Sequence, residues 1–481
     1  METHCADYIE DHLESQGNRV EAESSSDCRN WNELFDIFAK VFTSENDELK
    51  IRAAIKLAKM SRYAPENILA LTVPILLEFL KNPQSNPSPL LQAAIAYCLK
   101  CIASQCEGKL ADLIGQSGGI PILLTLLPNS EDVLQRALLK CLRNIIAFCG
   151  PNRVILASNG GLEIVLAMLS SCSDDSELIL LEILSALSLV REVRKSLWES
   201  RSVHLLVKAA GCGGLVSRTR AAQAMGLLGL IKRARYVLVE AGAVPVLMHL
   251  LKEGDSMMKL VAGNALGVIS SHVDHISLVA QAEFIPLYAD LLRGPDPTGK
   301  EIAEDVFCVL AVHEENAVTI FEHLVGILKE GDAGAKAAAA DVIWDLSSYV
   351  YSFPVVQRSG AIPILVELLK DESLDVREKV AGAVAQLSRD EADRAALARC
   401  GAIPCLIEML EDGESDEVRD NAAEALVNFS LDPLLGDRIS CIVDNPTFRN
   451  MSGRIMQMRV SDERMDGAVR EIRREQINNC L

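Results

Sequence analysis

Apolar residues recur at spacings of three and four along most of the chain, in segments separated by small or acidic turns. Two clear examples run from Val133 to Cys149 and from Val376 to Leu387. This spacing places the apolar side chains on one face of an α-helix. We therefore expect an all-α fold in which each helix buries one face against its neighbours.

One turn element recurs between these segments and contains two small residues, an aliphatic residue and usually a proline. The clearest copies are Gly118–Pro121, Gly242–Pro245, Gly360–Pro363 and Gly401–Pro404, with weaker ones at Gly160–Glu163 and Phe284–Pro286. Successive copies lie 42, 82, 41, 77 and 41 residues apart, so degenerate copies near His204 and Leu324 fill the two double intervals. Glycine ends a helix at positive φ, and proline fits the first turn of the next. We expect every repeat to break the chain at this corner.

A helical unit of this length cannot bury its apolar face alone, so neighbouring units have to stack into a continuous core. The segments Ala425–Ser430 and Leu142–Ile146 resemble the A-L-x-N-L-S pattern of armadillo repeats, and the Gly-Ala-Ile-Pro corner resembles the start of that family's second helix. The resemblance covers about residues 31–445 in roughly ten repeats. In detail it is nearest to plant-type armadillo proteins, including the repeat domains of U-box ligases and vacuole-fusion scaffolds.

This resemblance implies an all-α, armadillo-repeat, right-handed superhelical solenoid with a concave and a convex face. HEAT repeats have a similar period, and the recurrent corners favour armadillo over HEAT. The two ends differ from the array. Residues 1–30 are acidic and contain a serine run, which predicts a disordered tail, and residues 446–481 contain seven arginines and predict a helical cap or tail.

Charge and cysteine content restrict the partners and the compartment. The net charge of -20 disfavours nucleic acid, because phosphate binding depends on clustered Lys and Arg. The 14 cysteines are too sparse for a disulfide scaffold, which favours a reducing compartment. We see no signal peptide pattern, lipidation motif or long apolar span. We expect a cytoplasmic protein, with the nucleus as a second compartment and without membrane insertion.

Three candidate motifs suggest chemistry, but none is complete. Residues 294–301 nearly match a phosphate-binding loop, but Glu301 replaces the magnesium-binding hydroxyl and two prolines remove backbone donors. Cys98 and Cys101 form a CxxC without a second pair, so we expect them to pack in a helical core. His272 and His275 in a loop lack a third partner that sequence can place. We expect no catalytic residue, no cofactor, no metal and no enzyme activity.

In armadillo proteins the third helices line the concave face, and the Asn of the A-L-x-N-L pattern holds a partner's backbone. The resemblance implies a groove formed by this position and the position four residues earlier in each repeat. The expected partner-binding residues are Lys140, Asn144, Glu182, Gln223, Asn264, Asp305, Asp341, Asp345, Gln386 and Asn428. The apolar positions Ala186, Leu227, Val268 and Val309 form either the floor of the groove or interior packing. Importin-like members carry Trp at the earlier position, and this chain does not.

The groove positions are mainly acidic or amide, so we expect protein partners with basic, amphipathic or extended segments. The leading interpretation is a non-enzymatic scaffold or adaptor. The alternative is a substrate-recognition relative of plant U-box ubiquitin ligases that lacks the catalytic domain, because residues 1–60 contain no room for a U-box ahead of the first repeat.

Overall fold

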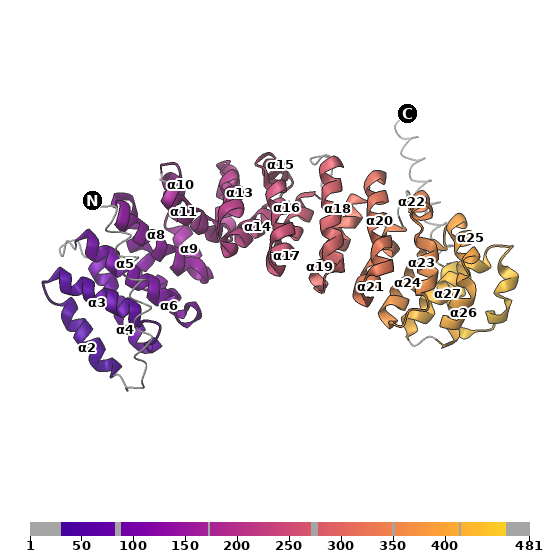
Figure 1. The fold of residues 1–481 in the computed structure, drawn as a ribbon, viewed down its shortest axis with the longest axis horizontal. Helices are drawn as coiled ribbons and strands as arrows, with labels where there is room; N and C mark the ends of the chain where they lie inside the picture. Colours follow the sequence, from indigo (N-terminus) through magenta and orange to yellow (C-terminus); the bar gives the residue numbers. More distant parts are fainter. Residues whose placement is uncertain are drawn as a thin grey trace, which may run out of the picture. The chain divides into compact units, whose positions relative to one another are not determined.

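The computed structural model describes residues 30–81, 88–171, 174–270, 278–348, 352–412 and 415–457. Within these ranges the regular elements are helices and no strand occurs, which confirms the all-α prediction (Figure 1). The chain divides into two compact units, Met1–Val246 and Leu247–Leu481, and the boundary falls inside helix α16. The acidic tail and the histidine loop of residues 272–275 lie outside the described residues, as does the chain after residue 457.

The N-terminal unit is a series of repeats in which a third helix follows one or two other helices. Consecutive third helices pack against each other in the order α3, α5, α8, α11, α14. Its elements are α2 (Trp31–Phe42), α3 (Asp47–Met60), α4 (Glu66–Lys81), α5 (Pro89–Ala103), η2 (Cys106–Gly108), α6 (Lys109–Gln116), α7 (Gly119–Leu126), η3 (Leu127–Asn129), α8 (Asp132–Ala147), α9 (Gly150–Ser158), α10 (Gly161–Leu169), α11 (Asp174–Leu187), α12 (Arg191–Glu199), α13 (Val203–Cys212), α14 (Leu215–Gly229), α15 (Lys232–Glu240) and the start of α16 (Ala243–Glu253).

The C-terminal unit repeats the same plan, and its third helices pack in the order α17, α19, α21, α24, α27. Its elements after α16 are α17 (Ser256–Ser270), α18 (Leu278–Arg293), α19 (Pro297–Leu310), α20 (Glu314–Glu330), α21 (Ala333–Leu346), α22 (Ser352–Ser359), α23 (Ala361–Leu368), α24 (Leu374–Leu387), α25 (Glu391–Arg399), α26 (Ala402–Asp412), α27 (Asp416–Ser430), η5 (Gly436–Arg438) and η6 (Ser440–Ile442). Residues 446–457 are also helical.

The glycine corners form where the sequence predicts them. Five glycines that precede a second helix have φ between 73° and 89°, a region that L-residues adopt at a cost: Gly118, Gly160, Gly242, Gly360 and Gly401. The degenerate copy near His204 also turns, because Arg201 takes a φ of 57° in place of glycine. At these six corners the repeat has three helices.

The expectation that every repeat breaks at this corner is wrong for two copies. Helix α18 continues through Pro286, and α20 continues past Leu324. Glu283 stands where a corner glycine would precede Phe284, so α18 has no residue suited to positive φ at that point. First and second helices therefore merge, and these repeats have two helices, as in HEAT repeats, where armadillo repeats have three.

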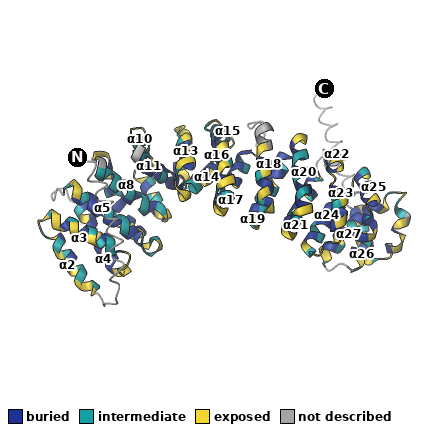
Figure 2. Ribbon diagram, viewed as in Figure 1, coloured by how far each residue is buried: buried dark blue, intermediate teal, exposed yellow. Residues whose placement is uncertain are grey.

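Aliphatic side chains fill the space between the helices, and buried positions face neighbouring helices (Figure 2). Cys98 is fully buried in α5, which confirms core packing for this residue. In the segment that resembles a phosphate-binding loop, residues 294–296 form the expected inter-helix connection, whereas residues 297–301 are the start of α19. There the Asp296 carboxylate caps α19 by accepting hydrogen bonds from the backbone N–H groups of Thr298 and Gly299, at 2.9 and 3.4 Å.

Arginines from first helices cap the preceding third helices. The Arg153 guanidinium donates to the carbonyls of Ile146 and Ala147, at 3.0 and 2.7 Å. Arg194 donates to Ser188 and Leu189, at 3.0 and 2.8 Å. Further caps of this kind link Arg235 to Gly229 and Arg394 to Ser388. These bonds satisfy carbonyls that a helix end leaves without intrahelical donors, and place positive charge at the negative end of the dipole.

Replacing Arg194 with Ala should lower the free energy of unfolding by about 1 to 2 kcal/mol, because two helix-end carbonyls lose a charged donor. Urea unfolding followed by circular dichroism measures the change. The matched control is Lys195→Ala, since Lys195 is exposed on the same helix and forms an exposed ion pair with Glu199, one turn away at 3.8 Å. Equal unfolding midpoints for the two variants would show that the cap contributes nothing.

Candidate protein-binding surface

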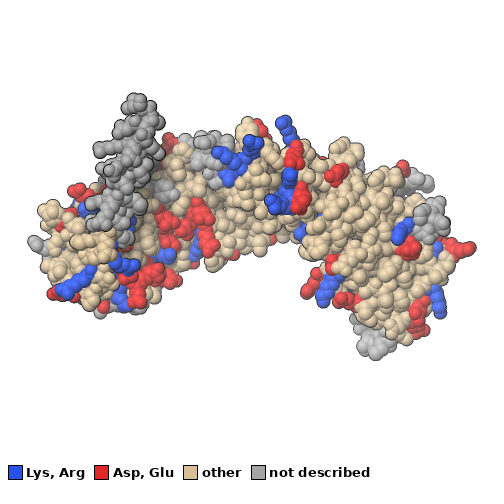
Figure 3. All heavy atoms as spheres, turned by 180° about the vertical axis from the view of Figure 1, so that it is seen from behind, with Lys and Arg blue, Asp and Glu red and all other residues tan. Residues whose placement is uncertain are grey.

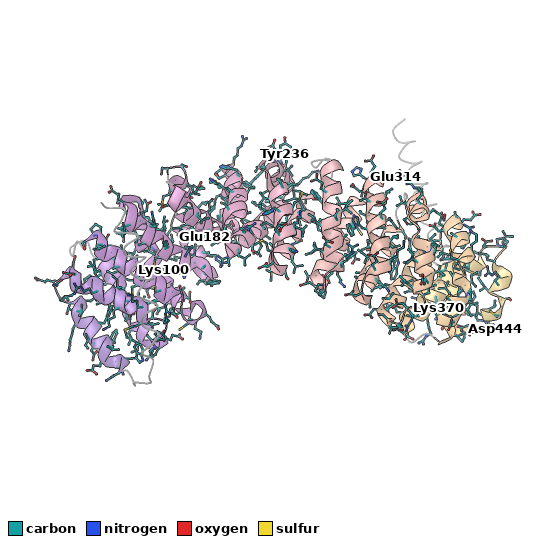
Figure 4. The ribbon with its side chains drawn as sticks, in the orientation of Figure 1. Lys100, Glu182, Tyr236, Glu314, Lys370 and Asp444 are labelled. Atoms are coloured by element: carbon teal, nitrogen blue, oxygen red, sulfur yellow. The ribbon has the colours of Figure 1, made fainter. Side chains whose placement is uncertain are left out.

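In the N-terminal unit, two of the predicted binding residues belong to one polar network. The Arg143 guanidinium lies 2.9 Å from the Glu182 carboxylate and donates to the Asn144 side-chain oxygen at 3.2 Å. The Asn144 amide nitrogen donates to the Ser104 hydroxyl at 2.9 Å. The network joins α5, α8 and α11, and Glu182 is labelled in Figure 4. These side chains thus hold neighbouring third helices together.

The other predicted positions of this unit differ in exposure. Lys140 is half-buried on α8, and Gln223 is exposed on α14. Of the two apolar positions, Ala186 is buried, which fits interior packing, whereas Leu227 is exposed and fits the floor of a groove.

In the C-terminal unit, four of the five carboxylates on the adjacent third helices α19 and α21 form one group. We call Glu304, Asp305, Asp341 and Asp345 the acidic row. Asp305 and Asp345 are exposed, and Glu304 and Asp341 are half-buried. On the face shown in Figure 3, acidic side chains gather over the C-terminal unit, at the left of the view. The sequence predicted three of the four members and missed Glu304.

Cationic and aromatic side chains border the acidic row on the α24 side. The Lys379 ammonium lies 2.8 Å from the Asp341 carboxylate and 6.0 Å from the centre of the Trp344 ring. The Asp341 and Glu304 carboxylates raise the pKa of Lys379 against the opposing effect of burial. One lysine therefore faces several carboxylates, and the local charge stays negative.

The Glu304 carboxyl group titrates near neutral pH. Burial, followed by the negative charges of Asp341 and Asp345, raises its pKa to about 7. The same surroundings raise the pKa of the Cys308 thiol to about 12, and its sulfur lies 3.9 Å from an Asp345 carboxylate oxygen. Four acids are thus confined where like charges already repel one another, an arrangement that a cationic ligand would relieve.

The predicted amides of the C-terminal unit differ in burial. Asn428 is buried and donates to the Ser388 hydroxyl at 3.0 Å and to the Ala385 carbonyl at 3.4 Å. Gln386 is half-buried, and Asn264 is exposed on α17. The apolar positions Val268 and Val309 are half-buried. The partner-binding role of all ten residues stays a prediction.

Replacing Glu304 with Gln should change how stability depends on pH. The pKa of Glu304 is raised on folding, so the folded state binds this proton more tightly than the unfolded chain does, and stability falls as pH rises from about 4.5 to about 7. The Gln variant avoids that loss. The melting temperature of the Gln variant minus that of the natural chain should therefore increase from pH 5 to pH 8. Glu301→Gln, at an exposed site on the same helix, is the control, and parallel profiles for all three chains would contradict the assignment.

Within the described ranges no single helix is long and apolar enough to cross a membrane. Two bent helix pairs, Cys106–Gln116 with Gly119–Asn129 and Lys232–Glu240 with Ala243–Glu253, meet the length and composition criteria jointly, with bends of 70° and 82°.

Comparison with known proteins agrees with this fold. A family model described as Armadillo/beta-catenin-like repeat matches residues 232–271, and one described as HEAT repeats matches residues 321–427. The second match begins within α20, where first and second helices merge. The sequence favoured armadillo over HEAT, and both kinds of repeat are matched in different stretches. No curated protein shows significant sequence similarity to the chain.

Two solved structures show the same architecture at low sequence identity. An engineered protein is 23% identical with a TM-score of 0.62, over 82% of this chain and 98% of its own. A chain from a study of a phosphorylation switch that controls the interaction between cadherin and beta-catenin is 14% identical with a TM-score of 0.62, over 87% of this chain and 86% of its own. The fold is therefore an all-α repeat solenoid of the armadillo and HEAT class. Solenoids of this class present extended surfaces and typically serve as protein-interaction scaffolds.

Proposed function

We propose that the protein is a non-enzymatic interaction scaffold and that the acidic row binds a basic, extended segment of a partner protein. The observation that carries the proposal is the confinement of four carboxylates on α19 and α21, two of them exposed and one with its pKa raised to about 7. A cationic segment would neutralise this repulsion, and the resulting field would also speed its association.

The spacing of the third helices suits an extended segment. Packed helices lie about 8 to 10 Å apart, and an extended chain rises about 3.3 Å per residue, so about three residues span one helix to the next. A segment of about 12 residues would then reach across the five third helices from α17 to α27. Exposed polar side chains such as Asn264 on α17 would meet its backbone.

Fluorescence anisotropy tests the proposal with two labelled peptides of about that length, one with Lys and Arg at alternate positions and one with Glu and Asp there. The full chain should bind the basic peptide saturably and more weakly as salt rises. No saturable binding of the basic peptide, or binding that does not weaken as salt rises, would reject the acidic row as its site. We further propose a cytosolic or nuclear location, because 14 cysteines in 481 residues are too sparse for a disulfide scaffold and suit a reducing compartment.

A further inference from the structure

Three consecutive repeats of the N-terminal unit present the same pair of side chains where a third helix ends. An apolar residue lies just beyond the helix, and an arginine follows five residues later. The pairs are Phe148 with Arg153, Leu189 with Arg194, and Leu230 with Arg235, so the pattern recurs every 41 residues. The Phe148 side chain is 76% exposed and that of Leu230 is 65% exposed, and Leu189 is half-buried. Large apolar side chains repeated at this exposure form an unusual surface for a folded chain.

The arginines of these pairs are held in place by the helix ends they cap. Because a guanidinium has five N–H donors in a rigid fork, an arginine that caps a helix can also bind a carboxylate. A fourth arginine, Arg220 of α14, donates to the Ala147 carbonyl that Arg153 also contacts, and lies 5.7 Å from the centre of the Phe148 ring. Burial and the neighbouring Arg153 lower the pKa of Arg220 to about 10. Two cations thus converge beside an exposed aromatic ring.

The C-terminal unit lacks the combination in its described copies. Val312 and Leu431 are exposed at the equivalent positions, but the residues five positions later are Ala317 and Gly436. The net charge also distinguishes the part of the N-terminal unit that carries these pairs. The stretch from Asp132 to Glu240 has 14 Lys and Arg against 9 Asp and Glu, a net charge of +5 in a chain of net charge -20. The apolar and basic features therefore coincide in one part of the N-terminal unit.

We infer that this surface, the Phe148 edge, binds an acidic segment of a partner protein in which apolar residues recur at about every third position. The Phe148 edge comprises Phe148, Leu189 and Leu230 with Arg153, Arg194, Arg220 and Arg235. Apolar side chains of the partner contact Phe148, Leu230 and the half-buried Leu189, and its carboxylates pair with the arginines between them. The edge ends at α15, on which Tyr236 is labelled in Figure 4. The inference is independent of the acidic row, which takes the opposite charge.

A labelled peptide with Leu at every third position and Glu or Asp between tests the inference on the full chain. The natural chain should bind it saturably, and Phe148→Ala/Leu189→Ala/Leu230→Ala should weaken binding about tenfold or more. The matched control is Val312→Ala/Leu431→Ala, which removes equivalent apolar side chains where no arginine follows, and binding should change less than about twofold. A second variant, Arg220→Gln, should weaken binding and reduce its salt dependence.

Other occupants give different results. Binding of the natural chain to anionic lipid vesicles but not to the peptide would overturn the inference. The inference would also fail if light scattering showed that the triple variant loses self-association while its affinity for the peptide is unchanged. Equal peptide affinity in the triple and control variants would overturn it as well. Circular dichroism melting establishes that both variants fold, as expected because the replaced side chains are on the surface.

Discussion

A chain carrying Asp305→Lys and Asp345→Lys is expected to bind the basic peptide about 10- to 100-fold more weakly than the natural chain. Both residues are exposed, so their replacement leaves the packing of α19 and α21 intact. The change converts two attractive contacts into repulsive ones beside Lys379, which already contributes a positive charge. Asp341 is left unchanged because its ion pair with Lys379 links α21 to α24. Anisotropy titrations at low and physiological salt measure the effect.

The control for this variant is Glu322→Lys/Glu367→Lys. It changes the net charge equally, at two exposed acids of the same unit, but on α20 and α23 rather than on third helices. Its affinity for the basic peptide should stay within about twofold of the natural value, apart from a small loss from the altered overall field. If both double variants lose affinity equally, the attraction is a property of net charge and the acidic row is not a site.

Replacing Gly382 with Ala should destabilise the C-terminal unit by about 1 to 3 kcal/mol, the usual cost of overpacking. A Cβ at this position would lie 2.4 Å from two ring atoms of Trp344, Cε3 and Cζ3. The indole belongs to α21, which packs against α24, so the ring or the α24 backbone has to shift to make room. Urea unfolding followed by Trp fluorescence measures the loss, and the fluorescence of the folded state should change as well.

Gly326→Ala provides the comparison, since Gly326 lies inside α20 and its nearest neighbour is the flexible end of Arg293 at 3.7 Å. Alanine is a better helix former than glycine, so this variant should gain about 0.5 to 1 kcal/mol. A Gly382→Ala chain that is equally stabilised would mean that the contact between Trp344 and position 382 does not hold the two helices together.

The sequence was informative about the fold because its strongest signals are local. Gly118 and Gly401 predict corners on their own, since few other residues adopt positive φ without strain. The merged helices α18 and α20 could be predicted only from the absence of glycine at the corner position. Pro286 instead favoured a break in α18. Pro286 lies inside α18, and without a residue suited to positive φ before it the helix continues.

The site was less predictable because its properties depend on pairs of helices. Asn144 and Asn428 occupy the position that the family pattern assigns to partner binding, yet their amides bind Ser104 and Ser388 of neighbouring repeats. The position that holds Trp in importin-like proteins is Gly382 here, and Trp344 of the preceding third helix fills the space above it. Contacts of this kind between side chains of neighbouring repeats cannot be predicted from the residue spacing within one repeat. The recurrence of Arg153, Arg194 and Arg235 every 41 residues was visible in the sequence, and it could have indicated the helix caps.

Photo-crosslinking of the basic peptide to the full chain, with the adducts located by mass spectrometry, tests the central claim most directly. We expect crosslinks on α19, α21 and α24. The acidic peptide should reduce these crosslinks no more than sodium chloride at the same ionic strength does. Crosslinks confined to α20 and α23, or to the N-terminal unit, would contradict the claim that the acidic row binds a partner segment.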